Sequence, residues 1–158
     1  MRALLISVLL LAALVAGCQT VNEASGPIRI TNVRVTTAPL YDGPAELVRM
    51  VDRETERQLV GTGKPGTPAT VNVVITQVWY TDGVNALIIG TVNRVRADVT
   101  VRDGAGTVLA SFETKADVPY QPHSLLGPFL LRGRQDMAMV DPKLAQWLAQ
   151  MIRARIYG

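Results

Sequence analysis

Two side chains that commonly carry chemistry occur once each in the 158 residues, a cysteine and a histidine. Cys18 directly follows an apolar run, whereas His123 lies far along the chain in the proline-flanked segment YQPHS. One thiol cannot form a disulfide within the chain, so Cys18 is a metal ligand, a nucleophile, a small buried side chain or a point of covalent attachment. A zinc site needs three or four protein ligands, and the chain has no second histidine or spare cysteine to complete one. We therefore expect no metal site and no cofactor.

The residues before Cys18 have the order of a secretory signal peptide. Arg2 supplies a positive charge, and the thirteen residues from Ala3 to Val15 contain one polar side chain, Ser7. A helix that spans a bilayer needs about 20 apolar residues, so this run is too short to be one. A charged start, a short apolar middle and small residues before the break are typical of a signal peptide that is removed.

The segment LVAGC, which ends at Cys18, resembles the lipobox of bacterial lipoproteins. The resemblance implies that Cys18 receives a diacylglyceryl group, that the chain is cut before it, and that its new amine is acylated. The palmitate-type chains would then exceed the two-signal requirement for stable anchoring. Gln19 stands where aspartate typically retains a lipoprotein in the inner membrane, so in a Gram-negative cell we expect the outer membrane. The alternative is an ordinary signal peptide with an incidental cysteine.

His123 is a weak candidate for catalysis. If Cys18 carries lipid, no Cys–His pair remains, and the neighbouring Ser124 is not placed for a dyad by adjacency alone. No nucleophile-elbow pattern supports a Ser-His-Asp site, although one assembled from distant residues stays open at this stage. We expect no catalytic residues and a non-enzymatic protein.

Composition and charge divide the chain into three parts. We expect a signal peptide over 1–17, a lipidated tether over 18–27 and one domain over 28–158. The tether, beginning QTVNEASGP after Cys18, is polar with Ser, Gly and Pro, as flexible linkers are. Removing Arg2 lowers the formal charge from +3 by one, and the remaining mild excess is not concentrated as in nucleic-acid-binding proteins. We expect no nucleic-acid partner.

Four strands are predicted. Ile28 to Thr36 is rich in β-branched residues, and its slipped alternation predicts a bulge near Thr31-Asn32. The segment 70–80 is apolar on both parities, and simple alternation puts Trp79 with Val71, Val73 and Ile75 on one face and Val78 with Tyr80 on the other. The segment 93–118 predicts a hairpin that turns at 103–106, with an inner side formed by Val95, Ala97, Val99, Val101, Val108, Ala110 and Phe112.

Two amphipathic helices complete the domain. The first is predicted to begin at Pro44 and to end before Gly61, with a buried stripe of Leu47, Val48, Val51, Thr55 and Leu59. The second is predicted to be capped by Asp141, with Pro142 at its first position and a stripe of Leu144, Trp147, Leu148, Met151 and Ile152. The order β-α-β-β-β-α predicts an α+β fold, a two-layer sandwich in which a mostly antiparallel sheet packs on two helices.

Two surface features are candidates for binding. The long segment 118–136 contains five large apolar side chains followed by two arginines, and we expect some of them to contact a partner or lipid: Leu125, Leu126, Phe129, Leu130, Leu131, Arg132 and Arg134. The alternative is that this segment closes an end of the core. Arg94, Arg96 and Arg102 are predicted on the outward sheet face with Asp98 among them, where they meet an acidic partner or lipid headgroup, or only solvent.

In size and element order the mature region resembles small α/β periplasmic lipoproteins of Gram-negative envelopes, including auxiliary lipoproteins of ABC-type transport systems and lipopolysaccharide-assembly lipoproteins. The resemblance transfers no binding residue. It implies an outer-membrane lipoprotein that faces the periplasm, held by its lipid anchor, and acts with an envelope protein partner as an accessory or scaffold in envelope assembly or transport. The alternative is a carrier or sensor that binds lipid in a groove between sheet and helices.

Overall fold

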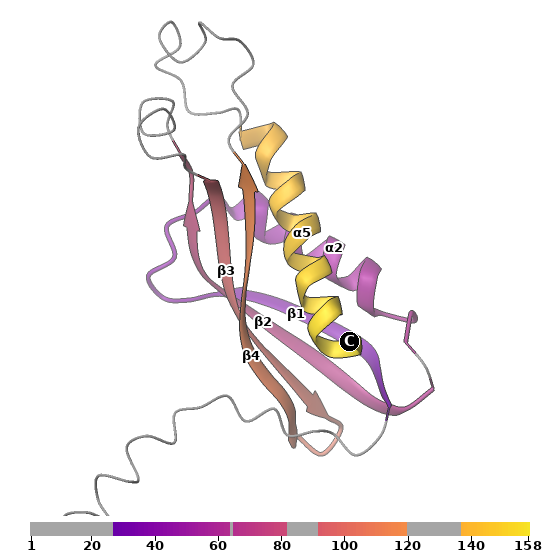
Figure 1. Ribbon diagram of the computed structural model, residues 1–158. Coiled ribbons are helices and arrows are strands. Elements are labelled where there is room, and N and C mark those ends of the chain that lie inside the picture. The colour runs from indigo at the N-terminus through magenta and orange to yellow at the C-terminus, as the bar shows by residue number, and fades with distance from the viewer. Residues whose placement is uncertain (1–26, 64, 82–91, 120–136) are drawn as a thin grey trace, which may run out of the picture.

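The computed structural model describes residues 27–63, 65–81, 92–119 and 137–158 (Figure 1). The chain order of its elements is β1 (Ile28–Thr37), α2 (Ala45–Leu59), β2 (Thr67–Trp79), β3 (Val92–Asp103), β4 (Val108–Pro119) and α5 (Met137–Tyr157). The predicted order β-α-β-β-β-α is confirmed.

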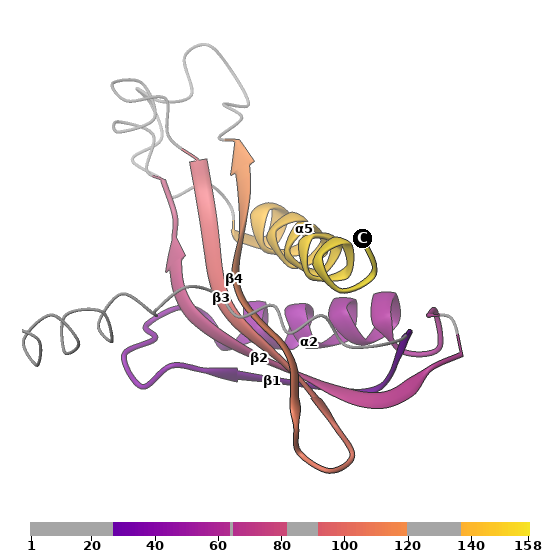
Figure 2. The same cartoon turned by 60° about the horizontal axis from the view of Figure 1, so that its bottom comes forward.

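The four strands form one sheet in the order β1-β2-β3-β4. β1 and β2 are parallel and joined through α2, whereas β2–β3 and β3–β4 are antiparallel. Both helices lie on the same side of the twisted sheet, and they run next to each other across it (Figure 2). The α+β two-layer sandwich is therefore confirmed, and we call the face under the helices the inner face and the opposite one the outer face.

The core lies between the inner face and the helices. Alternate residues of each strand point into it, and so do the apolar stripes of the two helices. Its fully or almost fully buried apolar side chains include Ile30, Leu47, Val51, Leu59, Val71, Val73, Ile75, Val95, Val99, Val101, Leu144, Leu148 and Ile152. Burying a side chain of this size contributes about 1.5–3 kcal/mol, so this layer holds the two helices on the sheet.

The bulge predicted in the first strand is confirmed at Thr31. Ile30 pairs with Ala69 and Asn32 with the next residue, Thr70, so that Thr31 has no partner of its own in the register. The Thr31 hydroxyl donates a hydrogen bond of 3.2 Å to the Ala69 carbonyl oxygen. The extra residue places Ile30 and the later valines of β1 on the same inner face.

A second bulge, at Thr76, corrects the predicted orientation of the end of β2. Ile75 pairs with Ala97, but Gln77 pairs with Arg96 and Val78 with Val95. The unpaired residue reverses the alternation, so Val78 and Tyr80 continue the inner face and Trp79 lies on the outer face opposite Arg94. The prediction that Trp79 shares a face with Ile75 was wrong because alternation alone does not reveal the inserted residue.

A third irregularity, at the start of β4, corrects another residue. Ala110 pairs with the inward Val101, as expected, but Val108 pairs with Arg102 on the outer side of the hairpin. Val108 was therefore placed wrongly in the core, whereas Phe112 is buried as predicted. The turn itself is confirmed: Gly106 donates to the Asp103 carbonyl at 3.0 Å and has a φ of 87°, a conformation that favours glycine.

The starts of both helices differ from prediction. Pro44 is not the first helical residue of α2 but its N-cap, with extended backbone, and no side chain caps this end. The second helix begins four residues before the predicted cap, at Met137, and both Asp141 and Pro142 lie inside it. Pro142 is the sixth residue of the helix, so it removes one backbone hydrogen bond in the second turn, near the N-terminal end.

The buried stripe of α5 is also shifted about the helix axis. Leu144, Leu148 and Ile152 are buried as predicted, together with Val140, Ala145 and Ala149. Trp147 and Met151, predicted on the same stripe, are 39% and 44% exposed. The central row of Leu144 and Leu148 has Ala145 and Ala149 on one side and Trp147 and Met151 on the other. The alanines face inward because their small side chains let the helix approach its neighbours closely.

Candidate functional site

The predicted lipid attachment site and the predicted contact segment lie outside the described residues. This applies to Cys18 and His123 and to the candidate contact residues Leu125, Leu126, Phe129, Leu130, Arg132 and Arg134. Neither of the two described helices is long and apolar enough to cross a membrane.

The outer face of the sheet is left open by the described helices and strands. Within the described ranges, no helix or strand packs on it, and both helices lie on the opposite side (Figure 2). On β3 the outward residues are polar, as the sequence predicted, and they alternate with buried residues of the inner face. These outward residues are Arg94, Arg96, Asp98, Thr100 and Arg102. Each faces a polar or charged residue of β4 except Arg102, which faces Val108.

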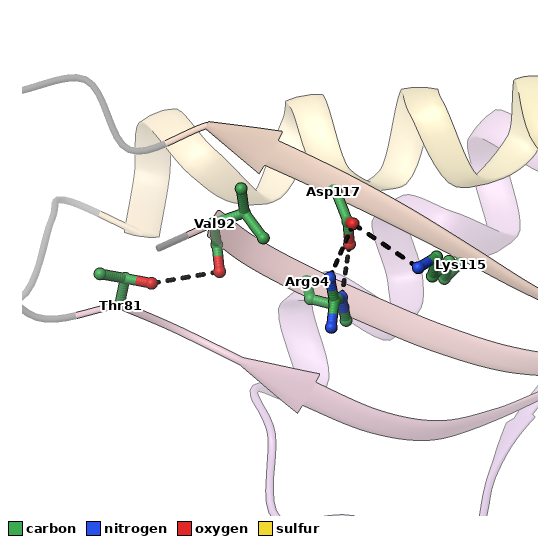
Figure 3. A network of polar contacts seen from close by, with 5 residues as sticks. All are labelled: Thr81, Val92, Arg94, Lys115 and Asp117. Atoms are coloured by element: carbon green, nitrogen blue, oxygen red, sulfur yellow. Dashed lines mark hydrogen bonds and ion pairs between the residues drawn. The ribbon is translucent and has the colours of Figure 1, made fainter. Parts of the chain in front are cut away.

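One end of this face is held by a paired charge. Arg94 donates two hydrogen bonds to the Asp117 carboxylate, from Nε at 2.6 Å and from Nη2 at 2.8 Å, and Lys115 Nζ lies 4.0 Å from the same carboxylate (Figure 3). The bond from Arg94 holds the pKa of Asp117 below its usual value. To the left of this pair in Figure 3, Thr81 Oγ1 donates a hydrogen bond of 3.1 Å to the Val92 carbonyl at the end of the β2–β3 ladder.

Next to this pair, the outer face is hollowed around Trp79. The depression has a volume of about 560 Å³ and extends from the loop after β1 across β2 and β3 to β4. We call it the Trp79 depression; its lining residues are Leu40, Asp42, Thr76, Gln77, Val78, Trp79, Arg96, Asp98 and Glu113. Leu40 is 94% exposed and Trp79 is 59% exposed, so its two large hydrophobic side chains face solvent.

The charges of the Trp79 depression are unpaired among the described residues. Asp42, Asp98 and Glu113 form no ion pair or side-chain hydrogen bond with any other described residue. Asp98 and Glu113 are direct partners in the β3–β4 register, so two carboxylates face each other across neighbouring strands. Arg96 is the one cation among the described lining residues, and its Nε is buried without a hydrogen-bond partner.

The loop that carries Leu40 and Asp42 is fixed by close packing. A side chain at Gly43 would collide with Val78 and with the Tyr41 ring, so only glycine allows this approach. The Tyr41 hydroxyl donates to the Pro44 carbonyl at 3.2 Å, and burial with the nearby carboxylates raises the pKa of Tyr41 to about 12. The loop therefore holds Asp42 beside the end of β2.

Behind the depression, a buried carboxyl ties α5 to the sheet. Asp141 is 4% exposed, and its Oδ1 accepts a 2.6 Å hydrogen bond from the Tyr80 hydroxyl. Burial raises the pKa of Asp141, the bond from Tyr80 opposes that shift, and Glu46 adds to it. Burial also raises the pKa of Tyr80. This hydrogen bond holds the first turns of α5 against the end of β2, so we assign the pair a role in stabilising the fold.

The described residues do not form a metal site. They contain no group of three or more His, Cys, Asp or Glu side chains placed to hold a metal ion. What the outer face offers is an exposed indole, an exposed leucine and unpaired charges in a shallow depression, which suits binding to another molecule. Sequence reasoning identified the arginines of this face but missed Trp79, Leu40, Asp42 and Glu113, because the bulge at Thr76 decides the side to which Trp79 points.

No protein-family model matches this sequence, and no curated protein matches it. Among solved structures, the fold is similar to that of a proposed lipoprotein from Caulobacter crescentus, with a TM-score of 0.46 and 11% identity over 78% of this chain and 86% of that one. It is similar to PelC from Paraburkholderia phytofirmans, solved as a dodecamer, with a TM-score of 0.45 and 12% identity over 86% of this chain and 96% of that one. A minor lipoprotein from Acinetobacter baumannii gives a TM-score of 0.41 and 12% identity over 82% and 92% of the two chains. These structures are similar to this chain in the path of the backbone only, and we infer no residue's role from them.

Proposed function

We propose that this chain is a non-enzymatic lipoprotein of the bacterial outer membrane, anchored through Cys18, whose periplasmic domain binds another envelope protein as an accessory or scaffold in envelope assembly or transport. The anchor rests on the segment LVAGC, which follows a charged residue and a short apolar run in the order typical of a signal peptide. The binding role rests on one observation: the outer face of the sheet carries an exposed tryptophan and no described element covers it.

The packing of the domain favours binding on this surface over carriage of a lipid inside. A carrier needs a groove between sheet and helices, but this layer is filled by side chains with 0–1% exposure, among them Val73, Val99 and Leu148. Opening space for an acyl chain would cost the burial of several such residues, each about 1.5–3 kcal/mol. Contact on the outer face disrupts none of them.

The position of the first strand suits a tethered domain. The predicted tether ends at Pro27, and β1 begins at Ile28. The nine residues from Gln19 to Pro27 reach about 30 Å when extended, so the domain can stand away from the membrane and meet a partner beside it.

The anchor is tested by Cys18→Ser in cells supplied with radiolabelled palmitate. We expect the variant to lose the label and to accumulate with its signal peptide uncut, while the wild-type chain is labelled and fractionates with the outer membrane. A Cys18→Ser chain that still incorporates palmitate would contradict the anchor.

The binding role is tested by placing a photo-crosslinking amino acid at single positions of the full chain in cells. Ser111 is exposed on the outer face opposite Thr100, whereas Arg53 is exposed on α2 with 71% of its side chain accessible. We expect a protein adduct from position 111, identified by mass spectrometry as an envelope protein, and none from position 53. Adducts from position 53 alone, or only lipid adducts, would contradict the proposal.

A further inference from the structure

We infer that the Trp79 depression is the docking site for a cationic segment of a protein partner, with a lysine or arginine seated between Trp79 and the carboxylates of Asp98 and Glu113. This inference rests on the proposed binding role and adds the chemistry of the partner. It follows from the charge of the depression, from the register of two strands and from the exposure of one aromatic ring.

The charges that line the Trp79 depression favour a cation. The lining carries three carboxylates, from Asp42, Asp98 and Glu113, against the single guanidinium of Arg96. The flanking cations Arg94 and Lys115 both lie against the Asp117 carboxylate, and adding these three charges to those of the lining still leaves the surface net negative. The depression is therefore net negative although the whole chain is net positive, and complementary charge selects a cation.

Asp98 and Glu113 lie directly opposite each other on β3 and β4. Like charges directly opposite each other on antiparallel strands destabilise the sheet, and a cation between them would remove that repulsion. A partner therefore gains affinity from relieving a cost that the free domain carries. A metal ion is a poor fit, since the described residues hold no group of three ligands that could bind one.

Beside these charges lies an exposed apolar surface, formed by Trp79 and Leu40. A cation over the face of a tryptophan is attracted by the ring, and burial of the ring strengthens that attraction. Leu40 lines the same depression and adds an exposed apolar side chain. A peptide with a basic residue next to an aliphatic one satisfies both features, whereas a small inorganic cation uses only the charge.

The test uses the full lipidated chain in neutral detergent with Trp147→Phe, which leaves Trp79 as the one tryptophan of the chain. The probe is a short peptide that alternates lysine and leucine with glycine spacers, and its matched control has glutamate in place of lysine. We expect the lysine peptide to change Trp79 emission saturably and the glutamate peptide to leave it unchanged. Equal responses to both peptides would overturn the inference.

Two double variants then localise the effect. Asp98→Asn with Glu113→Gln should weaken binding of the lysine peptide about tenfold or more and should raise Tm, because the repulsion between the two carboxylates is gone. Asp52→Asn with Glu56→Gln removes the same charge from α2, and we expect no change in affinity. An equal loss in both double variants would show attraction to charge in general and would overturn the site.

The lipid alternative and the proposed function have separate readouts. Vesicles of phosphatidylethanolamine that change Trp79 emission, when the lysine peptide does not, would replace the peptide with a lipid amine and overturn the inference. If the peptide fails while the adduct from position 111 persists in cells, the binding role stands and only the cationic assignment fails. If that adduct is also absent, both fail.

Discussion

The two faces of the sheet are made from the same strands, yet they follow different rules. On β3, Val95, Ala97, Val99 and Val101 are at most 1% exposed, while the residues between them stay polar and accessible. The inner face must fill the space under two helices, so its residue sizes are constrained by packing. No described element packs on the outer face, so packing does not constrain its unpaired carboxylates and exposed tryptophan, which is consistent with the proposed binding role.

The largest expected effect lies on the inner side. Leu148→Ala removes a fully buried side chain of α5 and should lower the free energy of unfolding by about 2–5 kcal/mol. Thr100→Ala on the outer face should change it by less than about 0.5 kcal/mol. Denaturant unfolding of both variants measures this difference, and similar losses for the two would show that the outer face is also packed.

A smaller effect is expected where the two layers are tied together by polar groups. Tyr80→Phe removes the donor to the buried Asp141 and should cost about 1–3 kcal/mol, the usual penalty for leaving a buried polar group without its partner. Asp141→Asn keeps an acceptor for Tyr80 and removes the charge, so at pH 7 its stability should equal or exceed that of the wild-type chain. A large loss in Asp141→Asn would mean that the charge itself is needed.

The pH dependence of Asp141 and of Asp117 should have opposite signs. Burial raises the pKa of Asp141 above its ordinary value of 3.8, so the folded state binds more protons there and its stability falls as pH rises from about 4 through the raised value. Arg94 lowers the pKa of Asp117 below 3.8, so its contribution is present above that value and is lost as pH falls through the lowered one. Asp141→Asn should remove the first dependence and Asp117→Asn the second, as measured by unfolding between about pH 2 and pH 8.

A small effect is expected when the surface ion pair of Arg94 and Asp117 is broken. Asp117→Asn should lower stability by less than Tyr80→Phe does at pH 7 in low salt, since the pair is bidentate but partly exposed. The loss should shrink at high ionic strength, which screens exposed charges. A loss that stays constant from low to high salt would show that the pair stabilises through packing.

The sequence was sufficient for the order of elements, the hairpin and its turn, the bulge at Thr31 and most of the core. These features follow from local patterns: alternation, β-branched runs, a glycine turn and a helical stripe. The direction of Trp79, the side of Val108 and the rotation of α5 were not accessible in this way. Each depends on where an inserted residue interrupts a ladder or on how closely a helix with small residues approaches the sheet, and both are set by tertiary packing.

The candidate site was predicted only in part for the same reason. The outward arginines of β3 could be read from alternation, but Asp42 reaches the depression from the loop after β1 and Glu113 from β4. Their convergence depends on the strand order and on the register of β3 with β4. That register places Asp98 opposite Glu113, and the spacing of the two residues along the chain does not predict it.

The most direct test of the account combines stability and contact in one outer-face variant. Trp79→Ser is made in the full chain that carries the photo-crosslinking residue at position 111, with Leu148→Ala as the control for lost packing. We predict that Trp79→Ser changes the free energy of unfolding by less than about 1 kcal/mol and abolishes the protein adduct. A Trp79→Ser chain that keeps the adduct, or that unfolds as easily as Leu148→Ala, would contradict the claim that this face binds and does not fold the domain.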